Sequence, residues 1–423
     1  MTHTPVAQGQ SMPSSAREQA HVMLINIGHF FDHLTTLVFA TVAALALSRE
    51  WGLSYAQLTA YATPGFVSFA LFSLPAGKLA DRWSREGMMA VYFFGLGLSS
   101  MAIAMAQSPL QISIGLFVLG IFAAIYHPVG LALLVQGRAR TGMTIAVNGV
   151  FGNLGVGCAA LVAGYFIDHG GWRMAYIVPG AICVVLGIVY TWLMRGEIGE
   201  RNAHATRRDA ALFAARGETA PVDRQLIIRL SAIIFLTAAL SSLIFQAVTF
   251  ILPKVFDERL HSIVGSATQL GWIAFLVFAV SSMAQLVTGA TLDRFGPRNV
   301  FVVAALLQTV FFGLMPGLMG WPALIVAFAF MFGAFGQVPI TDYLIGRMAK
   351  SELRAQVYGA RYVLSFTVMS LTLPFVAWVH ANWGFDRLFQ ILAVCAGMIL
   401  LAVTLLPRKL PDEAAAPAQP AAA

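Results

Sequence analysis

Titratable side chains gather in one otherwise apolar stretch near the start of the chain. His29, Asp32 and His33 lie within five residues, and Asn26 and Thr36 extend this polar set by a turn in each direction. At 100° per residue the five fall within about a 120° arc of a helix. A carboxylate beside imidazoles can hold a proton and pass it on. Asp32 is therefore the predicted site of reversible protonation, with His29 or His33 as its predicted relay.

Other apolar stretches carry further candidates. Tyr126-His127-Pro128 places a titratable ring beside a proline, which leaves a backbone carbonyl without its helical partner. Asp342 and Arg361 are predicted to form a buried pair, with either a structural role or a role linked to substrate or proton. A cavity facing water would make such membrane-depth groups tolerable. The remaining predicted cavity residues are Asn153, Gln246 and Gln337.

A metal site is the minor alternative for the same cluster. His29, His33 and Asp32 on one turn, with His127 opposite, have the ligand types that bind a divalent ion. A cluster on a single helix is a loose signal, so a metal-ion transporter or membrane metal sensor ranks below a proton site. The sequence contains no phosphate loop, nucleophile elbow or zinc-hydrolase motif, which argues against an enzyme and against a bound cofactor.

The elements that must position these residues are membrane helices. The chain is 58% hydrophobic and 11% charged, whereas a soluble domain carries about 25% charged residues. A span needs about 20 apolar residues, and twelve such runs predict an all-α membrane protein with twelve transmembrane helices. The predicted runs are 22–47, 56–79, 87–107, 109–135, 141–166, 174–194, 230–252, 267–290, 299–317, 322–346, 355–379 and 388–406.

The longest polar stretch between runs divides the chain into two parts. Residues 195–229 are predicted to be a cytoplasmic linker between an N-terminal six-helix half, 1–194, and a C-terminal six-helix half, 230–411. An Ala/Pro-rich tail, 412–423, is predicted to be disordered. The first 20 residues lack the charged-then-apolar order of a signal peptide, so cleavage is not expected.

Charge placement predicts the orientation. With both termini in the cytoplasm, twenty Lys and Arg side chains fall on the cytoplasmic side and five on the other, which is the positive-inside pattern of a bacterial cytoplasmic membrane. This bias accounts for the net charge of +7 without a nucleic-acid partner. The predicted partners are the lipid bilayer, protons and a small-molecule substrate.

Two polar loops repeat one pattern half a chain apart. Residues 77–85 and 289–298 each contain Gly, then Asp-Arg four and five positions later, then another Arg. A weaker echo joins 171–173 to 384–387. Parallel six-helix repeats are the construction of one large class of transporters. The residues predicted to gate the protein are Gly77, Asp81, Arg82 and Arg85 in the first loop, and Gly289, Asp293, Arg294 and Arg298 in the second.

These paired loops resemble the signature G-x-L-x-D-R-x-G-R-[RK] of the major facilitator superfamily, and the likeness extends over the twelve-span plan. The first copy departs at Ser84 and Glu86, the second at Thr291 and Pro297. The resemblance implies a monomeric transporter whose loops latch one face shut. It also implies that the first, fourth, seventh and tenth helices line a central cavity.

Within that superfamily the chain is most similar to the fosmidomycin-resistance type of drug exporters. The likeness rests on 29–32, Tyr126-His127-Pro128 and 152–155, and Val129 departs from it where an acid is usual. It implies proton-coupled efflux of a small amphipathic or drug-like compound. The alternative is proton-coupled uptake of an organic acid or another metabolite, with Arg361, and Arg138 or Arg140, attracting a carboxylate. The sequence leaves the substrate and the direction of transport open.

Overall fold

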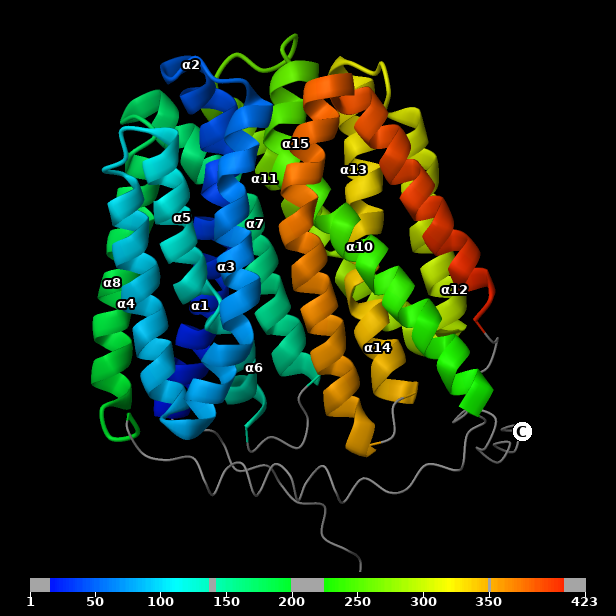
Figure 1. Ribbon diagram of the computed structural model, residues 1–423, viewed down its shortest axis with the longest axis horizontal. Helices are drawn as coiled ribbons and strands as arrows, with labels where there is room; N and C mark the ends of the chain where they lie inside the picture. The colour runs from blue at the N-terminus through cyan, green and yellow to red at the C-terminus, as the bar shows by residue number, and fades with distance from the viewer. Residues whose placement is uncertain (1–15, 137–141, 199–223, 349–350, 407–423) are drawn as a thin grey trace, which may run out of the picture.

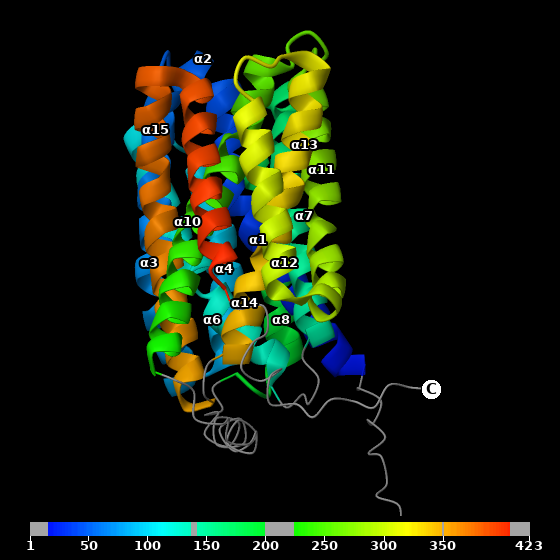
Figure 2. The same cartoon turned by 90° about the vertical axis from the view of Figure 1, so that its right-hand side faces the viewer.

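The computed structural model describes residues 16–136, 142–198, 224–348 and 351–406, and every regular element in that part of the chain is a helix. The helices run between two ends of one bundle, with the N-terminal elements on one side and the C-terminal elements on the other (Figures 1 and 2). Apolar side chains form the buried interior throughout. The all-α membrane fold expected from composition is confirmed.

The first half begins with a helix that is continued by a single π-helical turn. Serine side chains cap three helices of the first half. Ser54, Ser84 and Ser108 each accept a hydrogen bond from a backbone N–H in the first turn of the helix that follows. The elements are α1 (Ala16–Val42), η1 (Ala43–Leu47), α2 (Ser48–Glu50), α3 (Tyr55–Arg82), α4 (Arg85–Ile103), α5 (Pro109–Ala123), α6 (Tyr126–Val135), α7 (Gly142–His169) and α8 (Met174–Met194).

The second half contains two long elements that each turn back at a glycine. Gly296, with φ of 75°, divides α12, and Gly384, with φ of 71°, divides α15, because a residue without Cβ adopts positive φ at little cost. The elements are α10 (Arg224–Arg259), α11 (Ala267–Ser282), α12 (Ala284–Leu314), α13 (Gly320–Gly336), α14 (Val338–Met348) and α15 (Ser351–Thr404).

The span count agrees with the expected twelve. Ten helical stretches in the described residues are long and apolar enough to cross a bilayer. One of them, Ala360–Thr404, is 45 residues long and holds two helices on either side of Gly384. The twelfth is α3, which has 28 residues and extends along the bundle (Figure 1), although its polar residues and two prolines lower its mean hydropathy.

Two predicted spans contain a short distortion near a proline in matching places of the two halves. Regular α-helical hydrogen bonding is interrupted between α5 and α6, just before His127-Pro128, and between α13 and α14, just before Pro339, while Ala124, Ile125 and Gln337 keep right-handed helical φ and ψ. Proline has no N–H and its ring clashes with the carbonyl four residues earlier. The helix is therefore distorted but continuous at corresponding places in both halves.

The halves meet most closely at the end of the bundle where α2 lies, here called the α2 end. There the Asp168 carboxylate of α7 accepts hydrogen bonds from the Thr268 backbone N at 2.7 Å and its Oγ1 at 2.5 Å, on α11. A Cβ on Gly164 would come within 2.2 Å of the Ala267 carbonyl. Further in, Ser370 of α15 donates to the Phe66 carbonyl of α3 at 2.9 Å. The α2 end is closed.

Several predictions fall outside the described residues. Most of the predicted linker, residues 199–223, lies there, as do the tail 412–423 and the first 15 residues. Arg138 and Arg140 also lie outside. The end of α8 at Met194 coincides with the predicted end of the first half.

Candidate functional site

A buried carboxylate and an imidazole from different helices form the centre of the site. Asp32 of α1 is 1% exposed, and its Oδ2 lies 3.7 Å from Nε2 of His127, at the start of α6. Its other oxygen, Oδ1, has no hydrogen-bond partner in the described part of the chain. A carboxylate in such surroundings is easier to keep neutral than charged.

His29 and His33 extend the cluster along α1. The ring nitrogens Nε2 of the two histidines lie 3.2 Å apart, and Nδ1 of His29 lies 2.7 Å from the Asn148 carbonyl oxygen. A carbonyl only accepts, so the hydrogen of His29 is assigned to Nδ1. Its Nε2 then accepts from His33. The four titratable groups from α1 and α6 thus lie together, and their predicted place on a cavity wall stays a prediction.

A polar network inside the first half holds His29 in place. Asn148 of α7 donates from Nδ2 to Asn26 Oδ1 at 3.0 Å and to the Tyr126 hydroxyl at 2.8 Å. Tyr126 in turn donates to the Ile25 carbonyl at 2.9 Å and stacks on His29. Asn26 and Tyr126 are both buried, and their predicted role as substrate contacts stays a prediction. Sequence reasoning missed Asn148, whose only signal is one amide in an apolar run.

Glycines on α7 let this helix approach α1. A Cβ on Gly152 would lie 2.6 Å from Cε1 of His29, and one on Gly155 would lie 2.1 Å from the Phe30 carbonyl oxygen. Small residues at such contacts are typical of close helix packing in membranes. Asn153, between them, is 8% exposed, and its Nδ2 has no hydrogen-bond partner in the described residues.

The histidines could also hold a divalent ion. One ring nitrogen from each of His29, His33 and His127 can be chosen so that all lie within 4.8 Å of one another. Zn–N bonds of about 2.0–2.1 Å in a tetrahedron place the ligand atoms about 3.4 Å apart, so the wider separations would have to contract. The shortest contact, His29 to His33, is already explained by a hydrogen bond. The arrangement therefore fits a proton better than a metal.

One aromatic contact joins the cluster to the second half. The ring of Phe366, on α15, lies 6.3 Å from His127 and 5.3 Å from Phe69 of α3, between centroids. Tyr362 stacks one turn further along α15, 5.8 Å from Phe366. His127 therefore contacts Asp32 within its own half and Phe366 across the interface. Sequence reasoning did not single out these rings.

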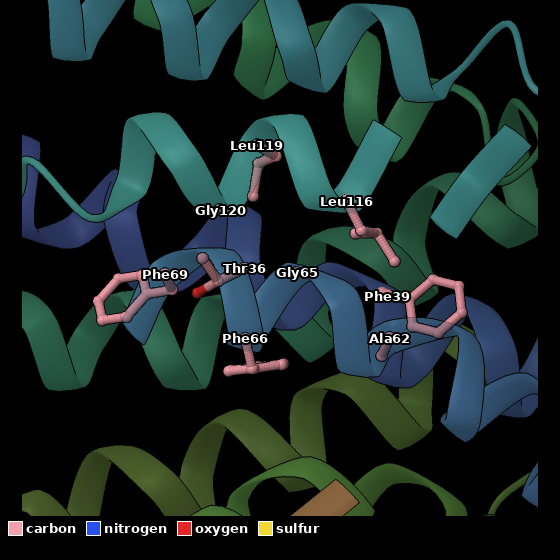
Figure 3. Close-up of a pocket in the computed structure, with 9 residues that line it drawn as sticks. All are labelled: Thr36, Phe39, Ala62, Gly65, Phe66, Phe69, Leu116, Leu119 and Gly120. Atoms are coloured by element: carbon pink, nitrogen blue, oxygen red, sulfur yellow. The ribbon is translucent and has the colours of Figure 1, made fainter. Parts of the chain in front are cut away.

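An apolar pocket adjoins the cluster between α1, α3 and α5 (Figure 3). It is small, with a cavity volume of about 20 Å³, and its nine lining residues include Thr36, Phe66 and Phe69. The hydroxyl of Thr36 donates to the Asp32 carbonyl at 2.8 Å, so the pocket begins one turn from the acid. The lining of this pocket is mostly apolar, so a bound molecule would contact apolar side chains rather than polar groups.

In the second half, Asp342 of α14 and Arg361 of α15 form the expected pair. Oδ1 of Asp342 accepts from Nη1 of Arg361 at 2.9 Å. Nε of Arg361 is buried and has no hydrogen-bond partner in the described residues. The guanidinium carbon lies 5.0 Å from the ring centre of Tyr362.

The predicted glutamines lie inside the second half. Gln337, at the break between α13 and α14, accepts from Nε2 of Gln308 on α12 at 2.9 Å. Gln246 of α10 is 2% exposed. The amide nitrogens of Gln337 and Gln246 lack hydrogen-bond partners among the described residues. Both amides retain unused donors for a ligand or water.

The first gating loop is held within its own half. A Cβ on Gly77 would lie 3.3 Å from the Pro128 ring, so this glycine allows α3 to pack on α6. Asp81 accepts from Arg85 Nη2 at 3.0 Å, and Arg85 also donates to Gln136. Arg82 is exposed. Ser84, where the superfamily signature has glycine, caps α4.

The second gating loop has different partners. Arg298 donates to the Thr404 carbonyl at 2.8 Å, and Arg294 lies over the ring of Phe295. Gly289 faces open space, so nothing packs against it as Pro128 packs against Gly77. The side chain of Asp293 falls outside the described part of the structure. The latch between halves predicted for these loops therefore stays a prediction.

Comparison with known proteins identifies a family match over nearly the whole chain. The model of the Major Facilitator Superfamily matches residues 25–262 and 234–422. The 4-hydroxybenzoate transporter PcaK of Pseudomonas aeruginosa is 23% identical over 93% of this chain and 94% of its own length. The multidrug resistance protein MdtG of Klebsiella pneumoniae is 22% identical over 84% of both chains. The gallate transporter of Pseudomonas putida is 26% identical over 50% of this chain and 48% of its own.

Solved structures agree in fold. A POT family transporter in complex with 5-aminolevulinic acid superposes with a TM-score of 0.72 at 13% identity, over 92% of this chain and 96% of its own. The inward-open xylose transporter XylE of E. coli superposes with a TM-score of 0.70 at 14% identity, over 94% of this chain and 98% of its own.

Proposed function

The chain belongs to the Major Facilitator Superfamily, and on that premise we propose that it couples proton movement to solute transport by alternating access. The protein is a multi-pass membrane transporter of the secondary type, not an enzyme. The observation that carries the proposal is the buried Asp32 beside His127, which also touches Phe366 of the other half. A proton taken up there changes a group at the interface between the halves.

Coupling requires that the proton interact differently with the two states of the transporter. Neutral Asp32 is tolerated in the dry packing between α1 and α6. Charged Asp32 needs either protonated His127 or a water molecule beside it. Either requirement changes the contact between His127 and Phe366. Protonation of Asp32 then favours one arrangement of the two halves, and loss of the proton favours the other.

The closed α2 end faces outward under the proposed orientation, with both termini in the cytoplasm. The charge bias of the sequence supports that orientation. Under that orientation Asp168 and Thr268 join the halves on the outer side, and we propose that opening of this side alternates with opening toward the cytoplasm. We further propose that the halves, 1–194 and 230–411, move about a linker, 195–229, within a monomer.

A small organic acid is the substrate class that we propose, with uptake as the direction. The relatives PcaK and the gallate transporter are described as carriers of aromatic acids, and PcaK matches this chain over nearly its full length. A buried cation, Arg361, offers a partner for a carboxylate.

Efflux of an amphipathic or drug-like compound is the second candidate. The multidrug resistance relative MdtG supports it, because that match also covers most of the chain. The likeness to fosmidomycin-resistance exporters stays a prediction. Vesicles with an acidic exterior and vesicles with an acidic interior separate the two directions: proton symport accumulates the compound when the exterior is acidic, and proton antiport accumulates it when the interior is acidic.

The test of the proposal is transport by the purified full-length protein in vesicles with an imposed pH gradient. A panel of aromatic acids and fosmidomycin would be screened for gradient-driven flux. Asp32→Asn should lose gradient-driven accumulation but keep exchange of labelled for unlabelled substrate, because the neutral form is still able to reorient. Asp257→Asn is the control, since Asp257 pairs with Lys254 near the α2 end at 2.7 Å.

Two results would decide against the proton site. Full gradient-driven flux in Asp32→Asn would remove Asp32 from the coupling. Loss of wild-type flux on addition of a chelator, with recovery on addition of zinc, would instead favour a metal at the three histidines.

A further inference from the structure

Arg361 is a buried cation whose hydrogen-bonding capacity is incompletely used. Its side chain is 14% exposed, and Nη1 is engaged by Asp342. Nε is buried without a hydrogen-bond partner in the described residues. A guanidinium presents five N–H donors in a rigid fork, and leaving a buried donor unpaired is unfavourable. Nε of Arg361 therefore still needs an acceptor.

A carboxylate is the group that matches the unused donors. Two parallel N–H donors on one edge of a guanidinium bind the two oxygens of a carboxylate, with a geometry that a neutral amide cannot reproduce. With Asp342 on Nη1, the unpaired Nε remains as a donor for the incoming anion.

Aromatic rings continue from this cation toward the first half. Tyr362 lies 5.0 Å from the guanidinium carbon of Arg361, and Phe366 stacks on Tyr362 with an interplanar angle of 28°. Phe69 then contacts Phe366 edge to face across the interface. Planar rings prefer such offset and edge-on neighbours, so a ligand with an aromatic ring next to its carboxylate finds matching surface here.

Asp342 is placed to act as a stand-in for the ligand. It offers the same chemical group as the predicted substrate, and its side chain is 42% exposed whereas that of Arg361 is 14% exposed. The carboxylate thus lies on the more open side of the pair. An incoming anion meets a partly neutralised cation and must compete with this internal carboxylate.

We infer that Arg361 is the carboxylate subsite for an aromatic monocarboxylate, that Tyr362 and Phe366 hold its ring, and that Asp342 is an internal competitor for the same cation. The inference rests on the proposed transport of an organic acid and deepens it. If the pair were only structural, removing the Asp342 charge would not improve binding of any anion.

The experiment is calorimetric titration of the full-length protein in lipid nanodiscs with three probes. Sodium benzoate should bind, and benzamide, which keeps the ring but lacks the charge, should bind at least about 10-fold more weakly. Cyclohexanecarboxylate keeps the charge but lacks the aromatic ring, and it should bind several-fold more weakly than benzoate.

Variants test the individual groups. Arg361→Gln should weaken benzoate binding about 10- to 100-fold, and Arg361→Lys should restore little of it, because an ammonium lacks the fork. Asp342→Asn should tighten benzoate binding several-fold, a gain that a misfolded protein cannot show. Arg387→Gln is the matched control, since Arg387 bonds Gln390 on the surface near the α2 end, and its benzoate affinity should equal that of the wild type.

The inference is overturned if wild-type protein fails to bind benzoate at millimolar concentration, if benzamide binds as well as benzoate, or if Asp342→Asn is no tighter. These titrations need no pH gradient, so they succeed or fail separately from proton coupling. Gradient-driven flux of another compound without benzoate binding would keep the proposed transport function and remove this subsite.

Discussion

The imidazole of His127 lies 6.3 Å from the ring of Phe366, centroid to centroid, and this contact places a titratable group of one half against the other half. The same imidazole also lies near Asp32, with 3.7 Å between Nε2 and Oδ2. A change of charge at Asp32 therefore reaches the interface through a single side chain. No long pathway of residues is needed.

Replacing Phe366 by Leu should weaken the coupling without removing the proton site. An aromatic pair is worth about 0.5–1.5 kcal/mol beyond its buried area, so gradient-driven transport should fall by a few-fold up to about 10-fold. Proton uptake by the purified protein, followed with a pH indicator, should remain. Phe375→Leu, on the same helix and half-buried, is the control; an equal loss there would mean that the effect comes from general packing.

Adding one methyl group to α7 should displace His29. A Cβ at Gly152 would lie 2.6 Å from the His29 ring, whereas one at Gly149 would lie 3.7 Å from Gln285, a flexible side chain. Gly152→Ala should therefore reduce gradient-driven transport about 5-fold or more, since overpacking typically costs about 1–3 kcal/mol. Gly149→Ala should retain most of the flux. Equal activity of the two variants in the vesicle assay would contradict the predicted contact with His29.

Removing the charge of Asp168 should open the α2 end more often. This carboxylate lies at the N-terminus of α11, where a helix favours an anion, and it accepts two hydrogen bonds from Thr268. Hydrogen bonds to charged groups contribute about 1.5–3 kcal/mol, so Asp168→Asn should shift the balance between states by about 10-fold. Spin labels on α7 and α11 would report a larger population with long distances. Asp257→Asn should leave the distances unchanged.

The two halves carry ion pairs of opposite polarity at the α2 end, and these should differ in strength. Arg259 is 8% exposed, pairs with Asp386 and donates to the Met315 and Leu318 carbonyls. Its counterpart pair joins Glu50 to Arg173, which are about 40% exposed. Arg259→Met should cost about 1.5–3 kcal/mol of stability, and Glu50→Gln less than about 1 kcal/mol.

Thermal unfolding in one detergent measures both variants. A larger loss in Glu50→Gln than in Arg259→Met would show that burial does not set the strength of these pairs.

The sequence by itself determined the class of protein and its general plan. Membrane helices must satisfy their own backbone and cover it with apolar side chains, so spans such as 174–194 and the loop before Trp321 were readable from composition. The polar arc of His29, Asp32 and His33 was also readable, because helical periodicity fixes which side chains share a face. The loss of a helical hydrogen bond at Pro128 was readable as well, because proline has no N–H.

Only the tertiary structure decided what faces that arc. Asn148, Phe366 and the close approach at Gly152 bring α7 and α15 to α1 and α6, and these contacts depend on how helices far apart in the sequence pack. An apolar run in the sequence does not reveal which helix packs against it, because a surface that faces lipid and a surface that faces another helix carry similar side chains. The grouping of the proposed proton-binding residues was therefore a local property of the sequence, and their contact with the opposite half was a property of the assembled bundle.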